Sequence, residues 1–225
     1  MTGSLVSPAL RARVRGLAEP IAVGLGRIGL SPNHLTLIGF AIAIVAAIAA
    51  ALGAWLVAGL LVIAGGACDL LDGALARATG RASSLGAFYD SVFDRWGEGV
   101  VYVGITWGAL GLGLWRPVIL SAAALASAVM VSYARARSES LGFTAGSGMA
   151  AVGLAPREVR VILLAVGLVA AGLLPGFEQA DGGAGGAAYP PSALALEAAL
   201  GLIAILATIT TIQRILHVRA QTGRS

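Results

Sequence analysis

The chain has 225 residues, of which 58% are hydrophobic and only 12% charged, and its mean hydropathy is +0.89. Soluble globular domains carry about 25% charged residues, so the composition argues against a soluble fold and a disordered chain. With one cysteine, it also argues against a secreted disulfide scaffold. The net charge is +4 and all 15 basic side chains are arginine. In a chain this apolar, such a charge is typical of a cytoplasmic membrane surface, so no nucleic-acid partner is predicted.

The first predicted element is a helix over about residues 8–29, in which arginines are interspersed with Leu, Val and Ile. Its apolar run is short and is broken by Glu19 and Pro20, which argues against a signal peptide. We therefore predict an amphipathic helix that lies in the membrane interface.

Six apolar segments follow, each close to the ~20 residues that cross ~30 Å of hydrocarbon as a helix. They cover approximately residues 34–53, 55–78, 85–112, 117–136, 158–175 and 193–213. No shift in composition divides the chain into two parts. The predicted fold class is an all-α integral membrane protein, a single domain over residues 1–225. It has six transmembrane helices preceded by the interfacial helix.

The placement of arginine predicts how the helices are oriented in the cell membrane. If the N-terminus is cytoplasmic, Arg116 is the one arginine in an outward-facing connection, whereas thirteen lie in inward-facing segments. The positive-inside rule then predicts that both termini are cytoplasmic. Arg219 and Arg224 are interpreted as anchors at that surface. The outward-facing residues 176–192 are rich in glycine and predict a flexible loop.

Four of the five aspartates lie at the end of the second predicted span and the start of the third: Asp69, Asp72, Asp90 and Asp94. Within each helix they are three or four residues apart and share a face, so a hairpin brings four carboxylates together at the cytoplasmic edge. Carboxylates repel one another and are costly to desolvate in a membrane, unless divalent cations neutralise them. An all-oxygen set of ligands suits Mg²⁺ or Mn²⁺ and not zinc.

The residues beside these aspartates indicate what else the site binds. Gly73 leaves room for a ligand to approach the helix, and Arg77 offers several donors to a phosphate group. Ser83 or Ser84 is the predicted N-cap of the next helix. The pattern predicts a metal-dependent site for a diphosphate at the cytoplasmic edge of the membrane.

Other interpretations use the same aspartates. They could pair with Arg77, Arg81 or Arg95 and hold helices together, or they could form the ion pathway of a transporter. The glycines beside the carboxylates disfavour the first, and the position of the acids at one edge disfavours the second. Intramembrane prenyltransferases also use Asp-rich helices, Mg²⁺ and a diphosphate, but their two Asp motifs are far apart in sequence.

Residues 69–94 contain the pattern D-x2-DG-x2-AR-x8-G-x3-D-x3-D. This pattern matches the signature of the CDP-alcohol phosphotransferase family at all eight fixed positions, and the six predicted spans agree with the family's topology. The resemblance implies that Asp69, Asp72, Asp90 and Asp94 hold two Mg²⁺ ions, with Mn²⁺ as an alternative. It also implies that Asp94 accepts a proton from the incoming alcohol. The contacts to the CDP-lipid that it implies are Asn33, His34, Leu35, Thr36, Gly73, Arg77 and Ser83.

The acceptor alcohol is indicated by arginines at the cytoplasmic ends of three predicted spans, among which Arg157 and Arg160 begin the fifth. Arg135, Arg137 and Arg214 converge on the cytoplasmic mouth of the site and suit an acceptor that carries its own phosphate. Positive-inside anchoring is the alternative role for these three residues.

Within the family the chain is most similar to bacterial phosphatidylinositol phosphate synthases, through its N-terminal helix, a Gly-Leu-Ser-Pro stretch, Ser-Tyr-x-Arg-Ala-Arg and a late Gln-Arg. The resemblance implies transfer of a phosphatidyl group from CDP-diacylglycerol to inositol 1-phosphate with release of CMP. Glycerol 3-phosphate as acceptor and an archaeal-type CDP-lipid as donor stay open. Arg135 replaces a lysine of these enzymes, and residues 155–158 differ from their Arg-Pro-Glu-Arg. Faces rich in Ala and Gly predict a homodimer.

Overall fold

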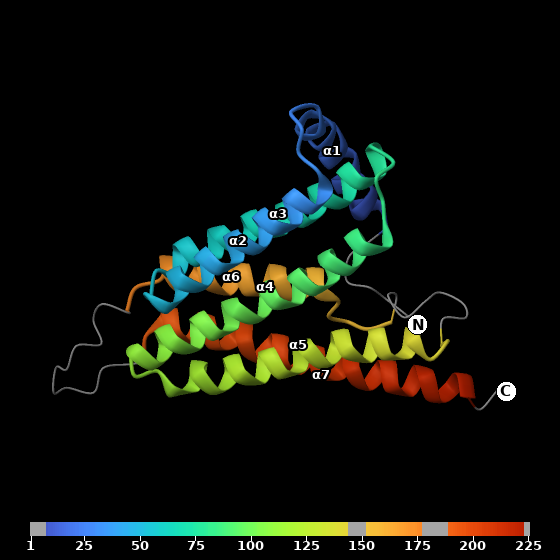
Figure 1. The fold of residues 1–225 in the computed structure, drawn as a ribbon. Coiled ribbons are helices and arrows are strands. Elements are labelled where there is room, and N and C mark those ends of the chain that lie inside the picture. Colours follow the sequence, from blue (N-terminus) through green and yellow to red (C-terminus); the bar gives the residue numbers. More distant parts are fainter. Residues whose placement is uncertain (1–7, 144–151, 177–188, 223–225) are drawn as a thin grey trace.

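The computed structural model describes residues 8–143, 152–176 and 189–222, and in these ranges the secondary structure is entirely α-helical. The seven helices are α1 Pro8–Arg27, α2 Pro32–Ala51, α3 Trp55–Ala78, α4 Ser84–Gly111, α5 Trp115–Ser140, α6 Arg157–Leu173 and α7 Pro191–Thr222 (Figure 1). The prediction of an all-α fold is confirmed. The predicted loop over 176–192 lies mostly outside the described residues.

Short turns join the helices, and their residues explain where the helices end. Gly53, Gly80 and Gly113 have φ angles of +75°, +64° and +69°, which L side chains rarely adopt, and each follows a helix terminus. Ser83, and not Ser84, caps α4, because its hydroxyl accepts a hydrogen bond from the backbone N–H of Gly86 at 3.1 Å.

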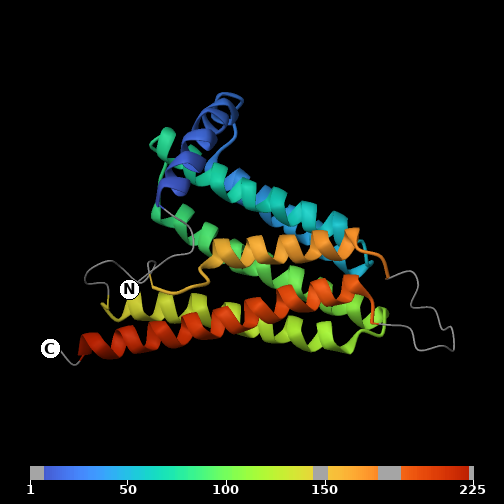
Figure 2. The same ribbon diagram turned by 180° about the vertical axis from the view of Figure 1, so that it is seen from behind.

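Helices α2 to α7 run up and down, so that α3, α5 and α7 end where α2, α4 and α6 begin (Figures 1 and 2). Helix α2 packs on α3 and α4, α5 packs on α7, and α6 lies between α3 and α7. Helix α1 lies across the end of the bundle against α3. Many buried side chains are small, including Ala46, Ala50, Ala58, Ala124 and Ala128. Small side chains let the helix backbones approach closely. In a membrane the hydrophobic effect does not drive helices together, so this close van der Waals packing stabilises the bundle.

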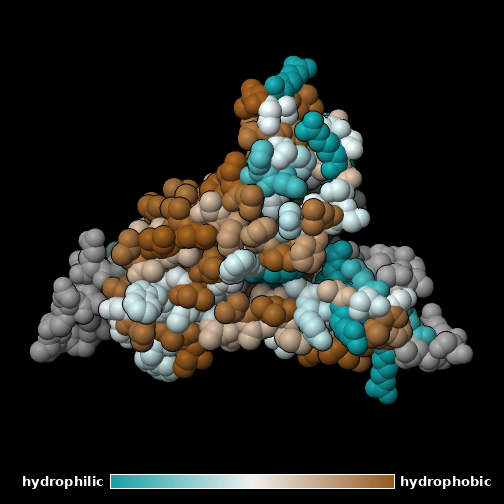
Figure 3. Space-filling model, viewed as in Figure 1, coloured by the Kyte–Doolittle hydropathy of each residue, from teal (hydrophilic) through white to brown (hydrophobic). Residues whose placement is uncertain are grey.

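Four of the described helices are long and apolar enough to cross a membrane: α2, α3, α5 and α7. Helix α6 has only 17 residues, and α4 carries charged side chains along its first half. Hydrophobic residues cover much of the visible flank, and hydrophilic ones gather at the end that holds α1 (Figure 3). The chain is a multi-pass membrane protein, and the crossing of the membrane by α4 and α6 stays a prediction.

Two helices continue beyond their predicted spans. Helix α5 reaches Ser140 and α7 reaches Thr222, four and nine residues past the predicted ends. Hydropathy marks where the chain leaves the hydrocarbon and not where the helix stops. Helices α5 and α7 pack on each other and stay side by side toward their C-terminal ends (Figures 1 and 2). As a result Arg137 and Arg214, which follow the predicted spans, also lie within helices.

Candidate active site

The four aspartates come from two helices that meet at the end of the bundle. Asp69 and Asp72 lie in the second half of α3, and Asp90 and Asp94 lie in the first half of α4. Asp72 is buried, and its Oδ2 accepts a hydrogen bond of 2.7 Å from Thr36 Oγ1 near the start of α2. Helix α2 therefore contacts α3 beside Asp72, and it also packs on α4.

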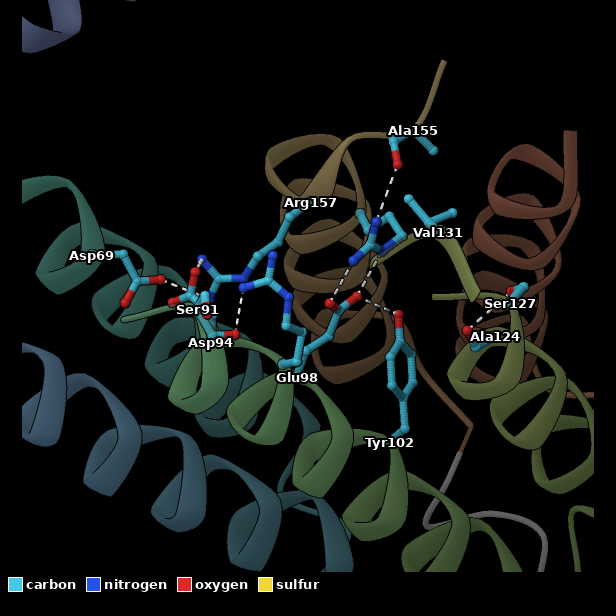
Figure 4. Close-up of polar contacts among 12 residues, drawn as sticks. Asp69, Ser91, Asp94, Glu98, Tyr102, Ala124, Ser127, Val131, Ala155 and Arg157 are labelled. Atoms are coloured by element: carbon cyan, nitrogen blue, oxygen red, sulfur yellow. Dashed lines mark hydrogen bonds and ion pairs between the residues drawn. The ribbon is translucent and has the colours of Figure 1, made fainter. Parts of the chain in front are cut away.

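Arg157, the first residue of α6, lies between two of the aspartates (Figure 4). Its Nη2 is 2.7 Å from Asp69 Oδ2, and its Nη1 is 3.0 Å from Asp94 Oδ2. The side chains are largely buried, which strengthens both ion pairs relative to pairs in water. Arg157 is not among the site residues predicted from the sequence, although its charge at the start of the fifth predicted span, near the mouth of the site, was a signal for it.

A second and deeper ion pair joins α4 to α6. Arg160 donates from Nη2 to Glu98 Oε2 at 2.7 Å and from Nε to Glu98 Oε1 at 2.8 Å, and both side chains are almost fully buried. Arg160 also donates to the carbonyl of Ala155 at 3.1 Å. Because Glu98 follows Asp94 by one helical turn and Arg160 follows Arg157 by nearly one, this pair sets the register in which Arg157 meets Asp94.

The carboxylates have the right chemistry for a divalent cation, but their contacts are made to other groups. Among the described residues no three Asp, Glu, His or Cys side chains are grouped so as to hold a metal ion. The physical reason is that Arg157 lies between Asp69 and Asp94, while Asp72 is bonded to Thr36. An all-carboxylate donor set nevertheless fits Mg²⁺ or Mn²⁺, so the residues present fit such an ion.

Two cavities adjoin the aspartates. The smaller lies among α2, α3, α4 and α6 and includes Thr36, Asp69, Asp94 and Arg157 in its wall. The larger has a volume of about 820 Å³ and has Asp90 and Asp94 in its wall. Five arginines also line the larger cavity: Arg95, Arg135, Arg157, Arg160 and Arg214. Asp94 and Arg157 thus belong to both cavities.

Comparison with known proteins gives the family. Residues 30–213 match the family model described as CDP-alcohol phosphatidyltransferase. The chain belongs to this family. It is therefore a CDP-alcohol phosphatidyltransferase, an enzyme of phospholipid synthesis, which confirms the resemblance found in residues 69–94.

Relatives of known name are archaeal and bacterial. The archaetidylinositol phosphate synthase of Pyrococcus horikoshii is 40% identical over 69% of this chain and 78% of its own length. That of Methanothermobacter thermautotrophicus is 36% identical over 92% and 91%. The phosphatidylinositol phosphate synthase of Mycolicibacterium smegmatis is 32% identical over 95% and 88%.

Solved structures of a Mycobacterium tuberculosis phosphatidylinositol phosphate synthase resemble this chain. The form with CDP-diacylglycerol bound has a TM-score of 0.73 and 29% identity, covering 89% of this chain and 92% of that one. The form in complex with manganese and citrate has a TM-score of 0.71 and 28% identity, covering 90% and 88%. A divalent metal ion in this family is consistent with the carboxylate donor set described above.

The predicted nucleotide contacts of this CDP-alcohol phosphatidyltransferase fall into two groups. A Cβ added to Gly86 would lie 3.1 Å from Ser83 Oγ and 3.3 Å from Asn33 Oδ1, so the starts of α2 and α4 are close together. Gly73 and the exposed Arg77 lie on α3 beside Asp72.

Two other predicted nucleotide contacts also have local structural roles. His34 Nδ1 accepts from the backbone N–H of Ser31 at 3.3 Å, and Ser31 Oγ accepts from the N–H of His34 at 3.3 Å, which forms a capping box. Leu35 is buried with Ala18 and Leu75 where α1 meets α3. These contacts position the start of α2.

The three arginines predicted to receive an acceptor phosphate do not lie together. Arg135 and Arg214 line the larger cavity, whereas Arg137 is exposed and outside that wall. Arg135 Nε pairs with Glu139 at 2.9 Å, which leaves its terminal nitrogens available. Arg214 is buried and donates to the carbonyls of Val152, at 3.1 Å, and Val131.

Proposed function

We propose that this enzyme joins a CDP-linked lipid to the hydroxyl of inositol 1-phosphate and releases CMP. One observation carries the proposal: the larger cavity has Asp90 and Asp94 in its wall together with five arginines. Carboxylates alone would repel an acceptor that carries a phosphate. Arginines in the same wall offset that repulsion and match the geometry of phosphate oxygens.

The archaeal relatives are archaetidylinositol phosphate synthases and the bacterial ones are phosphatidylinositol phosphate synthases, which supports inositol phosphate as the acceptor here. Both groups of relatives cover most of the chain, so the similarity includes the helices that line the larger cavity. Glycerol 3-phosphate is the alternative acceptor, and an assay that compares CMP release with each acceptor distinguishes the two. We also propose that the site opens to the cytoplasm. The arginine-rich helix ends lie at the same end of the bundle as the site, and such ends face the cytoplasm in membrane proteins.

The chain's own residues account for the proton and for the orientation of the substrates. Asp94, which is in contact with the larger cavity, accepts the proton of the acceptor hydroxyl. The hydroxyl oxygen then forms a bond to the phosphorus attached to the lipid, and the bond from that phosphorus to the CMP oxygen breaks. Asp69, Asp72, Asp90 and Asp94 would hold divalent cations, whose chemistry is to neutralise the charge of the diphosphate.

For the lipid donor, the similar proteins favour an archaeal-type CDP-lipid over CDP-diacylglycerol. The archaetidylinositol phosphate synthase that covers 92% of this chain is 36% identical to it, against 32% for the mycobacterial enzyme that covers 95%. The other archaeal relative is 40% identical over 69% of the chain. This supports an archaeal-type CDP-lipid over CDP-diacylglycerol. We expect purified enzyme to release CMP with a higher kcat/KM from the archaeal-type donor when inositol 1-phosphate is the acceptor. An equal or higher value with CDP-diacylglycerol would return the donor to the phosphatidyl class.

The acceptor pocket is tested by two arginines of the same helix. We expect Arg135→Ala to raise the KM for inositol 1-phosphate roughly 10- to 100-fold, because a charge-assisted hydrogen bond contributes ~1.5–3 kcal/mol. The matched control is Arg137→Ala, which removes the same charge two residues away and outside the cavity wall. Its KM should change by less than about twofold, as for an exposed surface charge. Equal effects of the two variants in steady-state kinetics, or equal use of inositol without its phosphate, would contradict a phosphate pocket.

A further inference from the structure

Arg157 makes contacts that a divalent cation would need. Its two terminal nitrogens take one oxygen each from Asp69 and Asp94, which belong to different helices. A guanidinium fork and a metal ion both bind carboxylates through the same lone pairs. A metal ion placed between Asp69 and Asp94 would therefore compete with the Arg157 guanidinium, because both cations draw on Asp69 Oδ2 and Asp94 Oδ2 and repel each other at this distance.

The position of Arg157 also leaves part of its guanidinium unsatisfied. Its Nε is buried and has no hydrogen-bond partner among the described residues. A buried donor without a partner costs free energy, so the contact with the two carboxylates is incomplete. The larger cavity of about 820 Å³, whose wall Arg157 already forms, gives the side chain room to leave the carboxylates.

We propose that Arg157 is a built-in competitor of the divalent cation: its guanidinium bridges Asp69 and Asp94 until an ion displaces it into the larger cavity. The inference rests on the proposed role of these aspartates as metal ligands. As a consequence, the positive charge of Arg157 partly neutralises Asp69 and Asp94 before the ion binds. Metal affinity is then lower than the four carboxylates alone would give.

The first test measures binding of Mn²⁺ to the full-length protein in detergent, by the loss of the free-ion electron paramagnetic resonance signal. Arg157→Gln removes the charge and keeps much of the side-chain length, and we expect its Kd for Mn²⁺ to fall at least about 10-fold. Arg157→Lys keeps the charge but has a single nitrogen, which cannot bridge two carboxylates in the same way. Its Kd should lie between those of the wild type and Arg157→Gln.

The matched control is Arg95→Gln, which removes a charge from the same cavity wall, beside Asp94 in the sequence. In the described structure Arg95 donates to the backbone carbonyl of Ser91 and not to a carboxylate. Through-space repulsion alone should therefore change the Kd of this variant by about threefold or less. A Kd that falls equally in Arg95→Gln and Arg157→Gln would overturn direct competition.

A second readout does not depend on affinity. In EDTA, Arg157→Gln leaves Asp69 and Asp94 without a bridging cation, so its Tm should fall below that of the wild type, and Mn²⁺ should restore most of the difference. A wild type that binds Mn²⁺ with the same Kd as Arg157→Gln would overturn this inference and leave the metal site in place. If neither the wild type nor the variants bind Mn²⁺, the proposed role of the aspartates as metal ligands is also wrong.

Discussion

The Asp94→Asn variant should turn over about 10² to 10⁴ times more slowly than the wild type, the range expected when a general base is lost. An amide has nearly the shape of a carboxylate but cannot take the proton of the acceptor hydroxyl. Asp94 is the aspartate that borders both cavities and also contacts Arg157 at 3.0 Å. The expected loss is therefore in kcat, measured as CMP release at saturating substrates.

Binding of the CDP-lipid separates this role from a general loss of structure. Asn33, Gly73, Arg77 and Ser83, the proposed donor contacts, are unchanged in the variant, so calorimetry should still detect the CDP-lipid. Glu197→Gln is the matched control, because it neutralises a carboxylate of α7 that pairs with Tyr189 at the opposite end of the bundle. A loss of CDP-lipid affinity as large as the loss of rate would remove the assignment of Asp94 as the base.

The Glu98→Ala variant should lose about 3–5 kcal/mol of stability, because it leaves the buried Arg160 without its partner. The pair is nearly inaccessible, with side-chain exposures of 1% for Arg160 and 4% for Glu98. The measurement is the free energy of unfolding in mixed micelles titrated with denaturant. The loss of stability should be the same with and without divalent cations, because Glu98 and Arg160 are not among the proposed metal ligands.

An exposed pair provides the comparison for Glu98. Arg135 and Glu139 are also an ion pair, but their side chains are 43% and 38% exposed, so Glu139→Ala should cost about 1 kcal/mol or less. Replacing both partners of the buried pair, as Glu98→Leu with Arg160→Met, should recover much of the stability, since neither charge is then left alone. A double variant as unstable as Glu98→Ala would contradict the explanation by an unpaired charge.

The pattern of neighbouring residues was sufficient to predict the limits of two helices and the helix faces that carry the aspartates. The predicted spans 55–78 and 85–112 agree with α3 and α4 to within a residue, because long apolar runs end at turn residues such as Gly80 and at a capping serine. Spacings of three and four residues place each pair of aspartates on one helix face. Such features depend on neighbours in the chain, so the sequence by itself determined them.

The contacts among distant residues were decided by tertiary structure. Arg157 reaches Asp69 across 88 positions of sequence, and Arg160 reaches Glu98 across 62. Arg135 and Arg137 read alike in the sequence, yet only the first lines the larger cavity, because residues two apart on a helix point in different directions. Which charges neutralise one another depends on how α6 packs between α3 and α7, and no local pattern contains that packing.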